Sequence, residues 1–211
     1  IKRTIGSRQF SKKPILINDL KLIIKVVNEE NIENKKNIKK KKEEKLRNKA
    51  LILLGFAGGF RRSELVNIHY EDIEFVTEGL KILVKRSKTD QAGEGIIKAI
   101  PYFANEEFCP VLGLKEYLEN KLDSFNRGKI FNISDKLVAL ILKKYSKLAG
   151  LDPNKYAGHS LRSGFATTAA EFGAEERNIM AMTGHKTTQM VRKYIQEANL
   201  FKNNALNKIK I

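Results

Sequence analysis

The chain has 211 residues, a hydrophobic content of 42% and a formal net charge of +16 at pH 7. This apolar content supports one folded domain rather than a disordered chain, and the charge favours polyanions, with nucleic acid first and anionic membrane surfaces second. A single cysteine, Cys109, excludes an intrachain disulfide and a cysteine zinc cluster, and we expect it to be a small buried residue. The sequence has no apolar run of the roughly eighteen residues that span a bilayer.

The first segment of the chain predicts a linker followed by a helix. Residues 1–13, IKRTIGSRQFSKK, are polar and basic and are typical of a linker. Pro14 and the Asn18–Asp19 pair then introduce a helix with apolar residues at helical spacing. The residues expected to face the core are Leu20, Ile23, Ile24 and Val27.

A run of charges, ENKKNIKKKKEEKLRNK, occupies residues 33–49. Such a run is most often a solvated face or a mobile loop, and the alternatives are a patch that contacts phosphates or, over residues 35–49, an anionic membrane surface. The apolar stretch Ala50–Ala57 predicts a helical segment, and GGF then leads to Arg61. From Ser63 the pattern SELVNI predicts another helix.

The second half of the chain predicts a β-hairpin followed by helices. Residues 80–86 and 96–102 alternate apolar and polar side chains and flank a connection that contains glycine, SKTDQAGEG. Further helices are expected over 110–122, 134–149, 160–172 and 175–182, and TTQMVRKYI continues as a last helix. The predicted fold class is therefore mainly α with a small antiparallel β-sheet (α+β).

Two short segments place an arginine beside another polar residue at helical spacing. Arg61 and Glu64 are three residues apart and share a helix face, which a plain surface ion pair would also explain. His159 and Arg162 have the same spacing at the start of a helix, where free backbone N–H groups favour a phosphate. A histidine that caps its own helix is the alternative for the second pair.

Three other candidates carry little weight when each is taken alone. Lys88 lies in the hairpin connection of a lysine-rich chain, and most lysines are solvent-exposed. His185 follows a glycine turn, and Tyr194 comes nine residues later, where a lone tyrosine would usually be a core residue. Together with two arginines, however, these residue types suit attack on a phosphodiester. Guanidiniums grip the oxygens, tyrosine is the nucleophile, and lysine protonates the leaving oxygen without a metal ion.

Over about residues 14–200 the chain resembles the catalytic domain of tyrosine recombinases, and closely that of phage-type integrases. The resemblance rests on five motifs in this order: GFRRSEL, RSKTDQ, HSLR, TGHK and VRKYI. The resemblance implies the integrase catalytic-domain fold and a catalytic set of Arg61, Lys88, His159, Arg162, His185 and Tyr194, supported by Glu64. Among neighbouring cations, Arg61 rather than Arg62, and Lys88 rather than Lys85 or Arg86, are chosen by the family pattern alone. His69 fits no catalytic motif and is expected to be structural or at the DNA surface.

The resemblance also implies a role for each of these residues. Tyr194 would form a 3′-phosphotyrosyl link, and Lys88 would protonate the leaving 5′-oxygen. His159 would assist proton transfer, His185 would hydrogen-bond the phosphate, and Glu64 would orient its neighbours. The expected function is therefore site-specific recombination of double-stranded DNA, the integration or excision of a mobile element, with no cofactor and no metal.

The expected organisation follows from the same resemblance. Residues 1–13 would be the linker from an N-terminal DNA-clamping domain, and residues 14–211 the catalytic domain, with a C-terminal tail from about residue 197. We expect a monomer when free and a homo-tetramer on paired DNA sites, in the cytoplasm with the nucleoid and without membrane contact. The tail can pack on a neighbouring protomer or on its own domain, with its apolar residues Leu200, Phe201, Leu206 and Ile209. The alternative functions are relaxation of DNA as by a type IB topoisomerase, or DNA binding without catalysis.

Overall fold

The computed structural model describes residues 12–32, 37–85, 95–122, 127–185, 187–200 and 205–209. The helices are α1 (Ile17–Glu29), α2 (Ile38–Ala57), α3 (Arg62–Val66), α4 (Pro110–Glu119), α5 (Asp135–Leu148), α6 (His159–Glu171), α7 (Glu176–Thr183) and α8 (Thr188–Asn199). The strands are β1 (Ile73–Val76), β2 (Gly79–Val84) and β3 (Ile96–Pro101). Short 3-10 turns are η1 (Tyr70–Asp72), η2 (Glu106–Phe108), η3 (Pro153–Lys155) and η4 (Ala205–Lys208).

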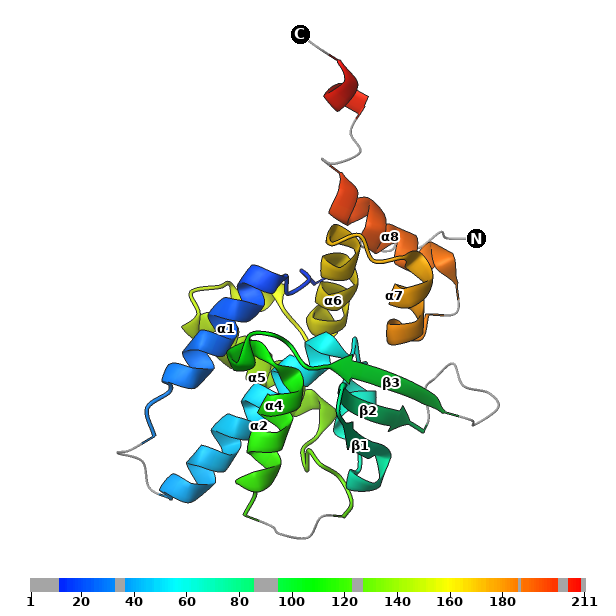
Figure 1. Ribbon diagram of the computed structural model, residues 1–211. Helices are drawn as coiled ribbons and strands as arrows, with labels where there is room; N and C mark the ends of the chain where they lie inside the picture. Colours follow the sequence, from blue (N-terminus) through cyan, green and yellow to red (C-terminus); the bar gives the residue numbers. More distant parts are fainter. Residues whose placement is uncertain are drawn as a thin grey trace, which may run out of the picture.

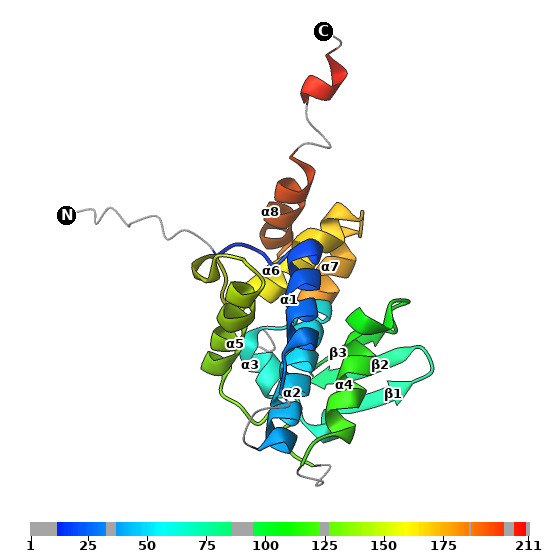
Figure 2. The ribbon, with the colours of Figure 1, turned by 90° about the vertical axis from the view of Figure 1, so that its left-hand side faces the viewer.

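The helices and the sheet pack together, and the last helices lie at one end of this arrangement. Figures 1 and 2 show α1, α2, α4 and α5 side by side, with the three strands along one flank. In both views α8 lies next to α6, and η4 lies farther out toward the C-terminus. Because α2 also packs on α6, the end of the helical body and the C-terminal helices meet there.

The sheet is antiparallel in the order β1-β2-β3. β2 and β3 form the predicted hairpin, with strands that end close to the expected bounds and with Ile82 opposite Lys98. β1 was not predicted, and it pairs with β2 through Ile73 opposite Ile82. This strand is short and has no alternation of buried and exposed residues, so its sequence pattern does not mark it as a strand. Its pairing with β2 makes it one.

The charged run before Ala50 is helical where the structure describes it. α2 begins at Ile38, so the loop interpretation is wrong for residues 38–49. Lys39 and Lys40 are exposed, whereas Leu46 is buried on the same helix as Ala50. A solvated helix face explains this run, because one side of the helix packs on the core while the other carries the charges.

The buried hydrophobic residues form two clusters of unequal size. The large cluster takes side chains from α1 to the start of α6 and from the sheet, and it includes the four residues predicted for α1. Cys109 is fully buried in it, as expected. The buried residues of the second cluster are Ala166, Ala170, Ile179 and Val191, from α6, α7 and α8.

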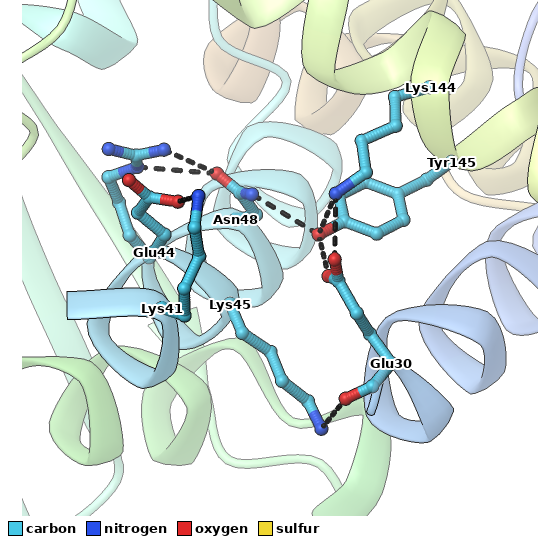
Figure 3. A network of polar contacts seen from close by, with 8 residues as sticks. Glu30, Lys41, Glu44, Lys45, Asn48, Lys144 and Tyr145 are labelled. Carbon is cyan, nitrogen blue, oxygen red and sulfur yellow. Dashed lines mark hydrogen bonds and ion pairs between the residues drawn. The ribbon is translucent and has the colours of Figure 1, made fainter. Parts of the chain in front are cut away.

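A polar network fastens the end of α1 to α2 and α5 (Figure 3). The Tyr145 hydroxyl donates to Glu30 Oε2 at 2.6 Å and accepts from Asn48 Nδ2 at 3.2 Å. Lys144 Nζ donates to Glu30 Oε1 at 2.9 Å, and Lys45 Nζ to the Glu30 carbonyl at 3.1 Å. Burial, and then the bond to Glu30, raise the pKa of Tyr145, so the phenol stays protonated at physiological pH and can donate to Glu30.

The ends of the chain are described only in part. Most of the predicted linker 1–13 lies outside the described residues, and the Lys13 amide donates to the Lys155 carbonyl at 2.8 Å. α8 continues to Asn199, past the expected start of the tail, and Phe201 is outside the described residues. Leu206 and Ile209 are exposed. Within the described ranges no helix is both long and apolar enough to cross a bilayer.

Candidate active site

Arg61 stands at the start of α3, directly after a tight turn that ends α2. Gly59 in this turn has φ +55°, a backbone conformation that favours glycine. A β-carbon there would also lie only 2.9 Å from Phe165 Cδ1, so space favours glycine as well. The Arg61 amide donates to Glu64 Oε2 at 2.9 Å, and Arg61 Nη1 donates to Glu64 Oε1 at 2.5 Å. Glu64 is buried, so one carboxylate both caps α3 and holds the Arg61 guanidinium in place.

The adjacent Arg62 has a different neighbour. Its exposed side chain lies across Gly158, the residue before α6, where an added β-carbon would come within 1.9 Å of Arg62 Cδ. Arg61 therefore pairs with Glu64, whereas Arg62 packs beside the start of the helix that carries His159. The sequence offered no means to separate these two arginines apart from the family pattern.

Arg162 is the most deeply buried cation of the site. Only 1% of the residue is exposed, and its Nη1 donates to the Gly59 carbonyl at 2.9 Å. Its Nη2 is buried and has no hydrogen-bond partner in the described part of the chain. A buried donor without a partner costs about 1–3 kcal/mol, so this nitrogen is suited to an acceptor supplied by a ligand. Burial and the neighbouring Arg61 lower the pKa of Arg162 to about 10, which leaves it charged at neutral pH.

His159 and Tyr194 meet between α6 and α8. His159 Nε2 lies 3.4 Å from the Tyr194 hydroxyl oxygen. Although His159 is exposed, desolvation by the surrounding protein, followed by the charges of Arg162 and Arg61, lowers its pKa. The ring is therefore neutral at pH 7. Tyr194 is half-buried against the second hydrophobic cluster, so its ring is packed while its hydroxyl reaches the histidine.

The orientation of the His185 ring is set by a hydrogen bond to Thr183. The Thr183 hydroxyl donates to the Ile179 carbonyl at 2.6 Å, so it accepts from His185 Nδ1 at 2.8 Å. This arrangement assigns the proton of the neutral ring to Nδ1 and leaves Nε2 as the second polar atom. Burial, followed by the charges of Arg162 and Arg61, lowers the pKa of His185 to about 4. The ring centroid lies 6.1 Å from that of Tyr194.

The structure thus brings together all the predicted site residues that it describes. These are Arg61, Glu64, His159, Arg162, His185 and Tyr194. The predicted lysine, Lys88, lies outside the described residues, while Lys85 forms an ion pair with buried Asp72. No group of three or more histidine, cysteine, aspartate or glutamate side chains in the described ranges could hold a metal ion. The arrangement can grip an anion and place a phenol beside a neutral imidazole.

Comparison with known proteins assigns the family. Residues 25–200 match the model of the phage integrase family. The chain belongs to this family. This integrase-family chain is 45% identical, over 99% of its length, to an integrase/recombinase XerD homolog of Selenomonas ruminantium. It is also 34% identical, over 79% of its length, to the tyrosine recombinase XerC of Rickettsia typhi. It spans 61% and 52% of these two relatives.

Solved structures share the integrase-family fold. The XerH recombinase bound to palindromic difH DNA in a post-cleavage complex has a TM-score of 0.69 at 17% identity, covering 92% of this chain and 54% of XerH. The XerA recombinase has a TM-score of 0.68 at 20% identity, covering 99% of this chain and 68% of XerA. The predicted fold class, mainly α with a small antiparallel sheet, is confirmed.

Two residues that the sequence reasoning missed also contact the site of this integrase-family domain. Thr183 bonds to His185, as described above, and Lys98 donates to the carbonyl of Gly58, in the turn before Arg61. For Lys98 a signal was present, because alternation in IIKAIPY places it on the same strand face as Ile96 and Ile100. For Thr183 the sequence holds no such signal.

Proposed function

We propose that this chain is the catalytic part of a site-specific recombinase that cuts and rejoins double-stranded DNA through Tyr194. The observation that carries the proposal is the contact between the Tyr194 hydroxyl and neutral His159, beside a buried Arg162 with a donor nitrogen unpaired in the described part of the chain. A phosphodiester supplies the acceptor that Arg162 lacks. The net charge of +16 suits a DNA partner, and the relatives named above are recombinases.

The cleavage step follows from the roles of these side chains. His159 accepts the phenolic proton while the Tyr194 oxygen attacks phosphorus. The bond from phosphorus to the 5′-oxygen breaks, the 5′-oxygen takes a proton from Lys88, and the 3′-phosphate stays on the tyrosine. Rejoining is the reverse reaction with a 5′-hydroxyl of another strand. One ester replaces another at each step, so neither ATP nor a cofactor is required.

The remaining residues act on the charge of the transition state. Arg61 and Arg162 donate to the non-bridging oxygens, with Arg61 oriented by Glu64. In the free protein His185 is neutral and its Nδ1–H is used by Thr183. A bound phosphate brings negative charge that raises the pKa of His185, and a proton on Nε2 would make this nitrogen a donor to the phosphate.

The proposed assembly is a homo-tetramer on paired DNA sites, formed from monomers. Leu206 and Ile209 are exposed, which suits a tail that packs on a neighbouring protomer. We retain residues 1–13 as a linker from a DNA-clamping domain and residues 14–211 as the catalytic domain. Sedimentation of the chain with and without duplex sites tests the assembly, and a single species of unchanged size on paired sites would contradict it.

Covalent trapping tests the function. The probe is a pool of nicked duplexes with a randomised core, in which the cut fragment diffuses away and leaves the protein attached. Wild type and the control Tyr102→Phe should give a covalent complex that resists denaturation, and sequencing the trapped DNA should yield a shared site. Tyr194→Phe should give none while it still shifts the duplex. If wild type only shifts DNA non-covalently, the chain is a binding module and the enzyme proposal fails.

A second assay separates recombination from relaxation. With the trapped sequence cloned into supercoiled plasmids, a recombinase should exchange strands between two copies of the site. A topoisomerase should relax a plasmid that lacks the site at a comparable rate. Relaxation without exchange would replace the recombinase proposal with the type IB topoisomerase alternative.

A further inference from the structure

Lys98 is a buried lysine on the inner face of the sheet, where its neighbours are apolar. Only 3% of the residue is exposed, and it lies opposite the fully buried Ile82. Since side chains alternate between the two faces of a strand, its ammonium points into the protein together with Ile100. A buried charge is unfavourable unless it is well paired, so the contacts of Lys98 have to account for its presence.

Those contacts lead to the turn that precedes Arg61. Lys98 Nζ donates to the Gly58 carbonyl at 2.7 Å and lies 4.2 Å from the centroid of the Phe60 ring. Arg162 Nη1 donates to the next carbonyl, that of Gly59, at 2.9 Å. Cations from β3 and α6 therefore hold two successive carbonyls at the C-terminal end of α2, where the helix dipole is negative.

The turn determines where Arg61 lies, because Arg61 follows Phe60 directly and is the N-cap residue of α3. Its guanidinium is fixed on one side by Glu64. The backbone that carries it is fixed by Lys98 from the sheet and by Arg162 from α6. Lys98 also belongs to the hairpin whose connection contains Lys88, so it joins that hairpin to the turn.

The charges around Lys98 make this link responsive to a bound anion. Burial and the guanidiniums of Arg162 and Arg61 lower the pKa of Lys98 to about 7, against the opposing effect of Glu64. A phosphate between the two guanidiniums would offset their repulsion and favour the ammonium. The hydrogen bond to the Gly58 carbonyl is stronger from a charged donor, so the turn would be held more firmly once DNA is bound.

We propose that Lys98 is a positioning residue for DNA cleavage, holding the turn that presents Arg61 to the scissile phosphate. Because it is buried behind the turn, it acts through Arg61 rather than on the DNA. The inference rests on the proposed function, since it assigns a part to Lys98 in the same step.

The test compares Lys98→Met, which removes the charge at similar size, with Lys98→Arg, which retains it. Lys81→Met is the matched control, because Lys81 is an exposed lysine on the neighbouring strand β2. We measure single-turnover formation of the covalent complex on the trapped duplex, the dissociation constant for the same duplex and the thermal midpoint. Lys98→Met should cleave about 10–100-fold more slowly with affinity within about threefold of wild type. Lys98→Arg should recover most of the rate, and Lys81→Met should match wild type.

Two further measurements separate positioning from other roles. Arg61→Lys combined with Lys98→Met should be little slower than Arg61→Lys alone, because both changes affect one guanidinium. A duplex with sulfur at the 5′-bridging position, whose thiolate leaves without a proton, should rescue Lys88→Met and not Lys98→Met. Rescue of Lys98→Met would make Lys98 a proton donor and overturn the inference.

The outcomes distinguish this inference from the proposed function. If wild type and Lys98→Met form the covalent complex at equal rates, Lys98 has no positioning role while the proposed function stands. If wild type forms none, both fail. Should Lys98→Met not fold, Lys98→Gln keeps an uncharged donor and must show the same selective loss of rate. A wild-type rate in folded Lys98→Gln would equally overturn a role for the charge.

Discussion

The two ends of the candidate site belong to regions that are packed very differently. Arg61, Glu64 and Arg162 directly adjoin Phe60, Leu65 and Leu161 in sequence, and these three belong to the large hydrophobic cluster. That cluster draws on α1 to α6 and the sheet, and we call this region the body. Tyr194 lies on α8, and His185 follows the C-terminal end of α7; we call α7, His185 and α8 the cap. The cap rests on α6 through a second cluster with four buried hydrophobic residues in the described chain.

This difference indicates that the two parts of the site are held with different rigidity. The groups proposed to bind the phosphate, Arg61 and Arg162, are already fixed within the protein, since their partners are a buried carboxylate and a backbone carbonyl. Tyr194, the proposed nucleophile, lies on a helix with less buried apolar surface, so the cap should open at a lower free energy than the body.

The largest effect is expected for the body's buried guanidinium. Arg162→Lys keeps a charge but loses the second donor nitrogen, and cleavage should fall by about 10²–10³-fold. Arg192→Lys is the control, because Arg192 is exposed on α8, and it should cleave within about threefold of wild type. Single-turnover trapping measures both. Equal rates for the two variants would remove Arg162 from the site.

A matched pair of valines compares the two clusters directly. Val138 in α5 and Val191 in α8 are both fully buried. Val138→Ala should lower the free energy of global unfolding by about 1–3 kcal/mol in urea titrations. Val191→Ala should lower it by less than about 1 kcal/mol and speed amide hydrogen exchange in α8 instead. If both valines give the same loss of global stability, the cap and the body unfold as one unit.

Acidification should weaken the fold through His185 at the junction of cap and body. Its pKa is about 4 in the folded protein and about 6.5 when unfolded, so the unfolded chain binds more protons between these values. The contribution is complete above pH 6.5 and is lost as the pH falls toward 4. From pH 7 to 5 the free energy of unfolding should fall by about 1–2 kcal/mol from this group. In urea titrations, the free energy of unfolding of His185→Asn should fall less between pH 7 and pH 5 than that of wild type. The same pH dependence in both proteins would contradict the lowered pKa of His185.

The smallest effect is expected for the threonine behind His185. Thr183→Val keeps the size but removes both hydrogen bonds, so the ring loses its fixed orientation and cleavage should slow by about five- to tenfold. Thr183→Ser retains a hydroxyl and should remain close to wild type. Histidine ring ¹⁵N spectra should show the proton on Nδ1 of His185 in wild type and on Nε2 in Thr183→Val. The Nε2 tautomer in wild type would contradict the proposed role of Thr183.

Much of the fold could be predicted because local pattern and burial agree. The helices from α4 to α7 lie within three residues of their predicted bounds, since their apolar spacing marks them and glycines follow α5, α6 and α7 closely. One strand, β1, was missed, and the charged half of α2 was left open between a solvated face and a loop. The lysine run of α2 has little helical amphipathicity of its own, and the core contact of Leu46 makes it helical. β1 is formed only by pairing with β2.

At the site, the family and the residue types could be read from the sequence, because order and local spacing are properties of the chain. The surroundings of these residues could not, because they arise from folding. The tertiary structure pairs Arg61 with Glu64 and lays Arg62 across Gly158. It also buries Arg162 with one donor nitrogen unpaired in the described chain, and sets Lys98 beneath the turn. Burial and hydrogen-bond partners depend on segments distant in sequence, and these determine which cations are fixed in place and which stay exposed.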